Sequence, residues 1–250
     1  MSEALLELER LRKSFGGVVV TNGVDLRVAR GEIVGLIGPK GAGKTTLANL
    51  ISGIYRPDAG DVRLAGRSIV GMPPYRIAHL GLLRTFQVSK LFGSLSVREN
   101  LLLPCLARAR APGQEKPGPY HGKRGVEQLL ESIKLSALAD LPARALSGGQ
   151  RALLQFASGL VVPDIRCYLL DEPFAGMNPA IKETMIELIE RENLARGVTF
   201  LVISHEMEEV KRLCSRIVVL AEGAVLMEGT LYDVVANRNV VDGWDDGGDP

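Results

Sequence analysis

The residues best suited to chemistry form a glycine-rich segment made up of Gly38, Pro39, Lys40, Gly41, Ala42, Gly43, Lys44 and Thr45. Glycines let the backbone curl so that successive N–H groups point toward a bound phosphate. Lys44 supplies a point charge for the β- and γ-phosphate oxygens, and the Thr45 hydroxyl can ligate Mg²⁺. The segment lies between an apolar run at residues 33–37 and a predicted helix at residues 45–54. This context is the one that a Walker A phosphate-binding loop requires.

Two carboxylates follow a second apolar run, at residues 167–170. Asp171 stands at the predicted strand terminus, where it can hold Mg²⁺ directly or through a water. Glu172 would point at the γ-phosphate, where it could polarise the attacking water. On its own, Asp-Glu-Pro after a strand is an ordinary turn, but the phosphate loop upstream favours the metal site.

Three further side chains are candidates because of their place in the chain. His205 follows an apolar run at residues 199–204 and could hydrogen-bond the γ-phosphate and hold Glu172 and water in line. Gln87 ends a short apolar segment, and its amide could touch Mg²⁺ or the attacking water. Phe15 could stack on adenine, an interaction worth on the order of 1 kcal/mol. The alternatives are a turn histidine, a solvated loop glutamine and a core aromatic.

A second helix start carries a hydroxyl and two glycines, in the order Leu146, Ser147, Gly148, Gly149 and Gln150. Such a start exposes backbone N–H groups that an anion can approach. Because no second phosphate loop accompanies it, the pattern suggests that two copies of such a chain share their nucleotides. The alternative is that Ser147 only caps a helix and that the glycines form a turn.

The elements that must position these residues alternate between strands and helices. Alternation of this kind predicts an α/β fold with a mostly parallel sheet. Residues 88–159 lack strand signals and are predicted to form a helical insertion, with a capping box at Ser96 and Glu99 that opens a helix at Val97. Strands are expected at residues 5–11, 18–28, 33–37, 61–64, 167–170 and 199–204, a hairpin at 216–220 and 224–228, and further helices at 126–137 and 179–195.

Composition limits the classes of partner. The 250 residues contain 30 Lys and Arg against 29 Asp and Glu, so the overall charge does not indicate nucleic acid or an anionic membrane. The three cysteines are widely spaced and are predicted to be reduced thiols. No apolar stretch approaches the roughly 18 residues of a membrane span, so another chain would have to cross any membrane.

In their order along the chain, these motifs resemble the ATP-binding subunit of an ABC transporter. The resemblance covers nearly the whole chain and implies ATP and Mg²⁺ as ligands. It implies a P-loop NTPase (RecA-like) core with a mostly parallel sheet, an N-terminal antiparallel β-subdomain and a helical insertion subdomain. The single domain, residues 1–250, would then divide into a core at 1–87 and 160–241, a helical subdomain at 88–159 and a flexible tail at 242–250.

The resemblance also assigns roles. Two subunits, identical or different, would pack head to tail, so that Ser147, Gly148 and Gly149 bind the γ-phosphate held by the partner. Glu172 would be the catalytic base, with His205 and Gln87 beside it. The metal ligands would be Thr45, Gln87 and Asp171, and the nucleotide site would extend to Thr46 and Gln150.

Finer motifs are similar to those of the ATP-binding subunits of branched-chain amino acid importers, a group that includes urea and amide uptake systems. These motifs are Phe15-Gly16-Gly17, Arg84-Thr85-Phe86-Gln87, Leu91-Phe92 with Ser96 to Asn100, and Ala175-Gly176-Met177-Asn178-Pro179. This similarity implies transmembrane permease subunits, indirectly an extracytoplasmic solute-binding protein, no nucleic acid, and a peripheral place on the cytoplasmic face of the inner or plasma membrane. Another importer, a lipid exporter and a soluble ABC ATPase acting on DNA or ribosomes are the alternatives. The chain departs from the pattern at Lys40, where asparagine is usual, at Gly148, where the group often has an aromatic residue, and at residues 151–159.

Overall fold

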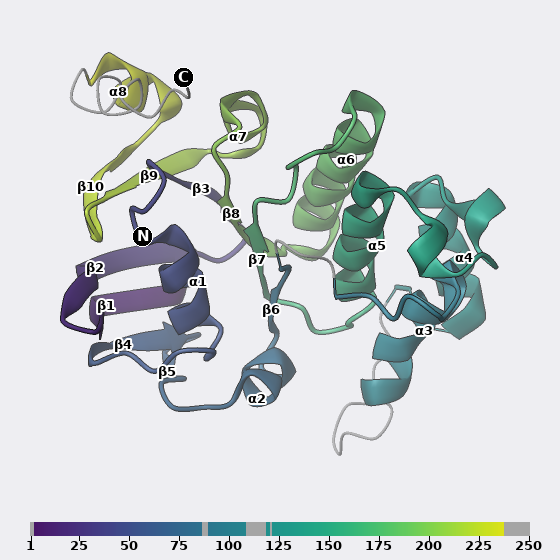
Figure 1. The fold of residues 1–250 in the computed structure, drawn as a ribbon, viewed down its shortest axis with the longest axis horizontal. Coiled ribbons are helices and arrows are strands. Elements are labelled where there is room, and N and C mark those ends of the chain that lie inside the picture. The colour runs from purple at the N-terminus through teal and green to yellow at the C-terminus, as the bar shows by residue number, and fades with distance from the viewer. Residues whose placement is uncertain (1–2, 87–89, 109–118, 121, 238–250) are drawn as a thin grey trace. The chain divides into compact units, whose positions relative to one another are not determined.

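The computed structural model of the chain describes residues 3–86, 90–108, 119–120 and 122–237 (Figure 1). The chain forms two compact units. The first comprises residues 1–84, 166–172 and 193–250, and the second comprises residues 85–165 and 173–192. The strands of both sheets belong to the first unit, and the second unit is helical.

The larger sheet of the first unit has the strand order β10-β9-β3-β8-β7-β6. All neighbouring pairs are parallel except β10 with β9, which form an antiparallel hairpin. The prediction of an α/β fold with a mostly parallel sheet is therefore confirmed. The strands are β3 (Ile33–Ile37), β6 (Leu82–Arg84), β7 (Cys167–Asp171), β8 (Thr199–Ile203), β9 (Arg216–Ala221) and β10 (Ala224–Gly229).

Strand β3 is held from both faces of this sheet. Every residue of β3 is buried, as expected of a central parallel strand with both faces covered. Leu36 packs in one apolar cluster with Leu47 of helix α1 (Lys44–Ile51). Ile37, on the opposite face, packs in another with Val210 of α7 (Met207–Leu213) and Val234 of α8 (Leu231–Ala236). The strand that leads into the glycine-rich loop is thus fixed between two hydrophobic layers.

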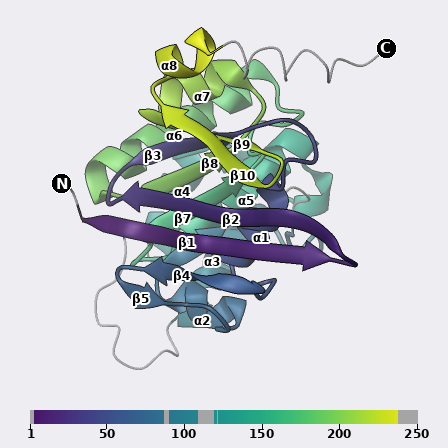
Figure 2. The ribbon, with the colours of Figure 1, turned by 90° about the vertical axis from the view of Figure 1, so that its left-hand side faces the viewer.

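The smaller sheet is antiparallel, with the order β2-β1-β4-β5 (Figure 2). Gly16 and Gly17 connect its two longest strands with φ angles of 54° and 86°, the positive values that a tight hairpin turn requires. The predicted N-terminal antiparallel β-subdomain is present. Its strands are β1 (Ala4–Phe15), β2 (Val18–Ala29), β4 (Ala59–Leu64) and β5 (Arg67–Ser68), and helix α2 (Pro74–His79) follows in the chain.

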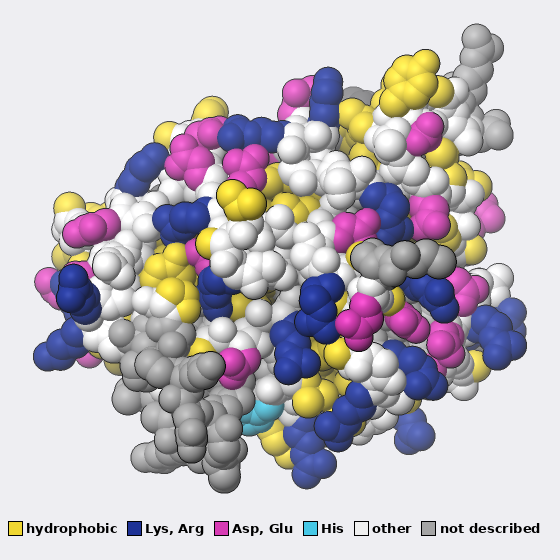
Figure 3. Space-filling view, turned by 180° about the vertical axis from the view of Figure 1, so that it is seen from behind, with side chains coloured by type: hydrophobic (Ala, Val, Ile, Leu, Met, Phe, Trp, Pro, Cys, Tyr) yellow, Lys and Arg dark blue, Asp and Glu magenta, His cyan; other side chains and the backbone are white. Residues whose placement is uncertain are grey.

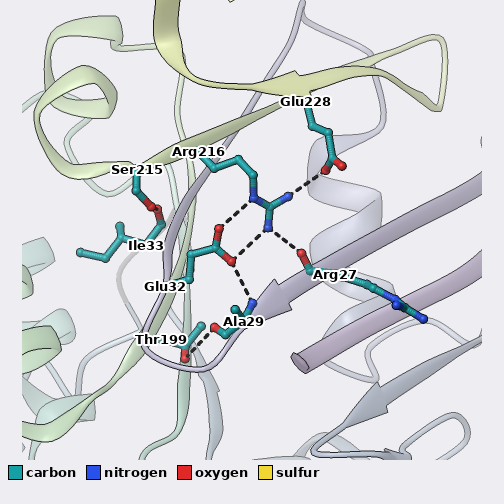
Figure 4. A network of polar contacts seen from close by, with 8 residues as sticks. All are labelled: Arg27, Ala29, Glu32, Ile33, Thr199, Ser215, Arg216 and Glu228. Carbon is teal, nitrogen blue, oxygen red and sulfur yellow. Dashed lines mark hydrogen bonds and ion pairs between the residues drawn. The ribbon is translucent and has the colours of Figure 1, made fainter. Parts of the chain in front are cut away.

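Arg216 links the two sheets of the first unit (Figure 4). Its guanidinium donates to both carboxylate oxygens of Glu32, at 2.8 and 3.0 Å, to Glu228 of β10 at 2.8 Å and to the Arg27 carbonyl of β2 at 2.6 Å. Burial alone would raise the pKa of Glu32, but hydrogen bonds from Arg216 and the Ala29 N–H, with the Arg216 charge, outweigh it and lower the pKa. The network therefore holds Glu32 in its ionised form.

The second unit is built of helices. No strand occurs in the part of it that the structure describes, where pairing is limited to a bridge between Ser96 and Pro142. The Ser96 hydroxyl accepts from the Glu99 N–H at 3.1 Å, and the Glu99 carboxylate accepts from the Ser96 N–H at 2.7 Å, so the predicted capping box is confirmed. The helices are α3 (Val97–Arg108), α4 (Gly122–Ser132), α5 (Gly148–Leu160) and the part of α6 (Pro179–Arg196) up to residue 192, with 3₁₀ turns at Ser136–Leu138 and Ala143–Ala145.

Two predicted helices end earlier than expected, each for a local reason. Helix α1 stops at Ile51 because Gly53 takes φ 73° and the N–H groups of Ile54 and Tyr55 both turn back to the Asn49 carbonyl. Helix α4 begins at Gly122 and stops at Ser132, and Lys134 then adopts φ 57°. The short elements β5, β6, α2, α7 and α8 were not predicted.

The charges on one face of the molecule and the state of the thiols agree with the composition. Figure 3 shows a face on which Lys and Arg side chains are interspersed with Asp and Glu side chains. Cys105, Cys167 and Cys214 are free, as predicted, and burial raises the pKa of the Cys167 and Cys214 thiols to about 12. Within the described residues, no helix has the length and apolar character needed to cross a membrane.

Candidate nucleotide-binding site

The glycine-rich loop lies between β3 and α1, against the backbones of two other strands. Gly38 and Gly43 have φ angles of 149° and 98°. A Cβ on Gly38 would stand 2.0 Å from the Leu220 carbonyl oxygen of β9, and one on Gly43 would stand 2.6 Å from the Val20 carbonyl oxygen of β2. Glycine is required at both positions. Gly43 is also the N-cap of α1, so the first turn of that helix has no capping side chain over its N–H groups.

Lys44 lies over the loop that precedes it. Its ammonium group donates to the Gly38 carbonyl at 2.6 Å and to the Pro39 carbonyl at 2.9 Å. Burial lowers the pKa of Lys44, and the negative charges of Glu172 and Asp171 oppose that shift. The loop lysine and the two carboxylates predicted from separate parts of the sequence therefore share one electrostatic environment.

The rest of the loop is open on one side. Pro39, Lys40, Gly41 and Thr45 are exposed, whereas Ala42 is buried and Thr46 is half-buried. Because these loop residues are exposed, an anion can reach the backbone N–H groups of the loop and of the start of α1.

Asp171 and Glu172 stand at the end of β7, as predicted. The Asp171 side chain is only 3% exposed and accepts from Arg84 at 2.8 Å. Glu172 has φ 50°, an uncommon value for a non-glycine residue, and its N–H donates to the Ile203 carbonyl at 2.8 Å. Residues with such uncommon φ angles are concentrated at functional sites, where the surrounding structure stabilises the strained conformation.

One carboxylate oxygen of Glu172 is buried beside His205. This Oε2 atom accepts no hydrogen bond of regular geometry from the part of the chain that the structure describes. The Nδ1 atom of His205 lies 2.9 Å from it, and the His205 side chain is 61% exposed. A buried carboxylate oxygen beside an exposed imidazole suits a group that accepts a proton from a water molecule.

The oxygen donors fit Mg²⁺ only together with a phosphate ligand. Among the described residues, no cluster of three or more His, Cys, Asp or Glu side chains could hold a metal by itself. The Thr45 hydroxyl and the Asp171 carboxylate are hard oxygen donors, and Mg²⁺ is usually held by one or two protein groups with waters and phosphate oxygens. Gln87, the third predicted ligand, lies outside the described residues.

Phe15 is available for stacking. Its side chain is 41% exposed, so it is not a core aromatic. It makes an edge contact with Tyr55, with ring centroids 5.2 Å apart, and the Lys13 ammonium lies 5.3 Å from its ring centroid. Lys13 is held in turn by Asp58 at 2.7 Å. The sequence analysis did not identify Tyr55 as a neighbour of Phe15. The signal available for it was an aromatic residue in the turn that follows α1.

The serine-glycine motif opens α5 in the second unit. The Ser147 hydroxyl accepts from the Gln150 N–H at 3.2 Å, and the Gln150 side chain accepts from the Ser147 N–H at 2.9 Å, which forms a complete capping box. A Cβ on Gly149 would stand 3.2 Å from the Ile181 side chain, whereas one on Gly148 would meet nothing within 4 Å. The capping role of Ser147 is present, and anion binding by the motif stays a prediction.

The first unit thus brings together Lys44, Asp171, Glu172 and His205. It adds Arg84, which was not predicted although a basic residue in an otherwise apolar segment was a signal. Ser147, Gly148, Gly149 and Gln150 belong to the second unit.

Comparison with known proteins gives one consistent result. The family model described as ABC transporter matches residues 21–175. The chain is 36% identical to "Probable branched-chain amino acid transport ATP-binding protein LivG" of Archaeoglobus fulgidus, over 95% of this chain and 94% of that protein. It is 38% identical to the lipopolysaccharide export system ATP-binding protein LptB of Acidithiobacillus ferridurans, over 94% and 93%. A crystal structure of a nucleotide-free ATP-binding cassette from an ABC transporter superimposes with a TM-score of 0.82 at 30% identity, over 96% of this chain and 98% of that one.

Proposed function

Because this chain belongs to the ABC transporter family as an ATP-hydrolysing subunit, we propose that it energises the import of branched-chain or related amino acids through separate permease subunits. Relatives that cover nearly its whole length carry names of branched-chain amino acid transport. The family motifs around Phe15, Gln87 and Asn178 support the same group. A relative of similar identity serves lipopolysaccharide export, which makes a lipid exporter the second candidate.

The loop residues from Gly38 to Thr46 bind the phosphates of ATP in this proposal. The exposed N–H groups of the loop and of the first turn of α1 surround the phosphate oxygens. The Lys44 ammonium exchanges its contacts with the Gly38 and Pro39 carbonyls for β- and γ-phosphate oxygens. Phe15 receives the adenine ring on its exposed surface.

Thr45 and Asp171, with Gln87, would hold Mg²⁺, which supplies neutralising charge at the phosphates when bound. Glu172 accepts the proton of the attacking water at its buried Oε2 atom. His205, 2.9 Å from that atom, holds the carboxylate and the water in line. The contact between the buried Oε2 atom of Glu172 and the Nδ1 atom of His205 is the observation that carries the hydrolytic mechanism.

The partner assignments follow from the same motifs. Ser147, Gly148 and Gly149, with Gln150, serve the γ-phosphate held by a second ATPase subunit, which is another copy or a related chain. The pair acts on permeases from the cytoplasmic face of the membrane, and an extracytoplasmic protein delivers the solute. The near balance of 30 Lys and Arg against 29 Asp and Glu gives no support to nucleic acid as a partner.

Replacement of Glu172 by Gln tests the mechanism. Because general-base catalysis contributes roughly 10²–10⁴-fold, we expect phosphate release to fall by at least about 100-fold while ATP binding is retained. Glu208→Gln, an exposed change on α7, is the matched control and should leave both unchanged. Phosphate release at the wild-type rate by Glu172→Gln would refute the role of Glu172.

The transported solute is tested on the assembled complex. We expect the subunit, purified from membranes, to bring permeases and a solute-binding protein with it. Reconstituted vesicles should accumulate labelled leucine, isoleucine or valine when ATP is supplied on the side of this subunit. Outward lipid transfer instead would establish the exporter, and a soluble pool bound to nucleic acid would establish a non-transport ATPase.

A further inference from the structure

Arg84 makes a buried connection that the mechanism above does not use. It is the last residue of β6, and its side chain is 5% exposed. One guanidinium nitrogen donates to the Asn49 side-chain oxygen at 2.6 Å and to the Ser52 hydroxyl at 3.1 Å. The other terminal nitrogen donates to Oδ2 of Asp171 at 2.8 Å. All four residues belong to the first unit.

The partners of Arg84 come from the elements that carry the nucleotide site. Asn49 is in α1, the helix that begins at Lys44, and Ser52 is its C-cap. Asp171 ends β7. The guanidinium thus joins the helix that follows the phosphate loop to the carboxylate proposed to hold Mg²⁺.

The backbone register explains why Arg84 reaches Asp171. Arg84 pairs with Leu169 in the parallel ladder between β6 and β7. Side chains two residues apart on a strand project on the same side, so Arg84 and Asp171 share one face of the sheet. The ladder itself already fixes the two strands, and what the Arg84 side chain adds is the orientation of the carboxylate.

The planar fork of arginine is needed for this arrangement. Two nitrogens in fixed directions contact α1 and β7 at once, whereas a lysine ammonium is a single point charge on a flexible stem. The contact also places a permanent positive charge beside the Asp171 carboxylate, whose side chain is only 3% exposed. A buried carboxylate without such a partner would be strongly unfavourable.

We propose that Arg84 is a positioning residue for the metal: its guanidinium fixes the orientation of the Asp171 carboxylate that would hold the Mg²⁺ accompanying the nucleotide. The inference rests on the proposed role of Asp171 as a metal ligand. Partners that orient a metal ligand typically change metal affinity by about 10–100-fold when they are removed. Arg84 should therefore control metal affinity more than nucleotide affinity.

The test measures binding of Mn²⁺, as a spectroscopic substitute for Mg²⁺, to the full chain in the presence of ADP. We expect Arg84→Lys to weaken Mn²⁺ binding by at least about tenfold. Binding of ADP in EDTA should change by less than about twofold, because the loop contacts to phosphate are retained. Arg63→Lys is the control and should leave Mn²⁺ binding unchanged. Arg63 is a half-buried residue of β4 with ion pairs to Glu9 and Asp61.

Asp171→Asn separates this inference from the proposed function. If Asp171→Asn leaves Mn²⁺ affinity unchanged, the metal role of Asp171 is wrong. If Asp171→Asn weakens Mn²⁺ binding and Arg84→Lys does not, the positioning role of Arg84 is wrong. In the double variant, Arg84→Lys should add nothing to Asp171→Asn, and an equal loss in both backgrounds would show that Arg84 acts through general stability instead.

Asn49→Ala provides a second variant in case Arg84→Lys does not fold. It removes one contact that orients the guanidinium while the ion pair remains. We expect a smaller loss of Mn²⁺ affinity than with Arg84→Lys, again with ADP binding in EDTA preserved. An Asn49→Ala protein with wild-type Mn²⁺ affinity would overturn the proposal.

Discussion

Alanine substitutions at Gly38 and Gly41 test the shape of the phosphate loop separately from its chemistry. Both glycines have positive φ angles, 149° and 83°. A Cβ on Gly41 would meet nothing within 4 Å, whereas one on Gly38 would overlap the Leu220 carbonyl oxygen, 2.0 Å away. The pair thus distinguishes backbone strain alone from strain with a collision.

The two magnitudes follow from this difference. An L-residue in left-handed backbone is unfavourable by about 1–2 kcal/mol, and we expect Gly41→Ala to lower the free energy of unfolding by that amount. Gly38→Ala must also displace β9, which pairs with β3 through Ile37 and Val219 next to the collision. Such a change belongs with the exceptional losses of more than about 4 kcal/mol.

Thermal and urea unfolding, followed by circular dichroism without nucleotide, measure both variants. In a chain of this size 1 kcal/mol corresponds to about 2–4 °C in Tm. Gly41→Ala should therefore unfold about 2–8 °C below wild type, and Gly38→Ala at least about 8 °C below. Equal losses for the two variants, or a smaller loss for Gly38→Ala, would refute the packing of the loop against β9.

Three further outcomes are expected. Because the pKa of Glu32 is lowered in the folded state, its stabilising contribution is present above the ordinary pKa of 4.5 and is lost as pH falls through the lowered pKa. Glu32→Gln should therefore reduce the loss of stability to urea below pH 4.5. An unchanged dependence of stability on pH would contradict this. Tyr120→Phe removes the hydroxyl that donates to the buried Glu192 carboxylate at 2.5 Å. It should lower the free energy of unfolding by about 1–3 kcal/mol. An unchanged urea midpoint would contradict this expectation. Cys167, fully buried and with its pKa raised to about 12, should be alkylated only on unfolding, and mass spectrometry that found it labelled in the native protein would disprove its burial.

The buried parallel strands were the most predictable part of the fold. β3, β7 and β8 are short apolar runs in which every residue is buried, and each was located from sequence to within one residue at either end. Their identity is local, because a strand covered on both faces needs apolar residues throughout. The capping box at Ser96 fixed the start of α3 for an equally local reason.

Elements and contacts that depend on distant residues were not predictable. β6 has only three residues, and it is a strand because it pairs with β7. The paired residues Leu82 and Cys167 are more than eighty positions apart in the chain. The contact of Arg84 with Asp171 follows from that pairing and was missed with it. The edge contact of Phe15 with Tyr55 likewise joins a hairpin turn to the segment after α1.

The two glycines at the start of α5 differ in whether packing within the unit leaves room for a side chain. Gly149 is explained by packing, since a Cβ there would press on Ile181 and Met177 at 3.2 and 3.5 Å. Gly148 is exposed, and a Cβ there would meet nothing within 4 Å. Packing within the unit therefore does not explain glycine at position 148. The importer group that the chain resembles often has an aromatic residue at this position, so the proposed contact with a nucleotide held by a second subunit does not depend on a missing side chain. It would be made by the backbone N–H at this exposed helix start, which any residue except proline supplies.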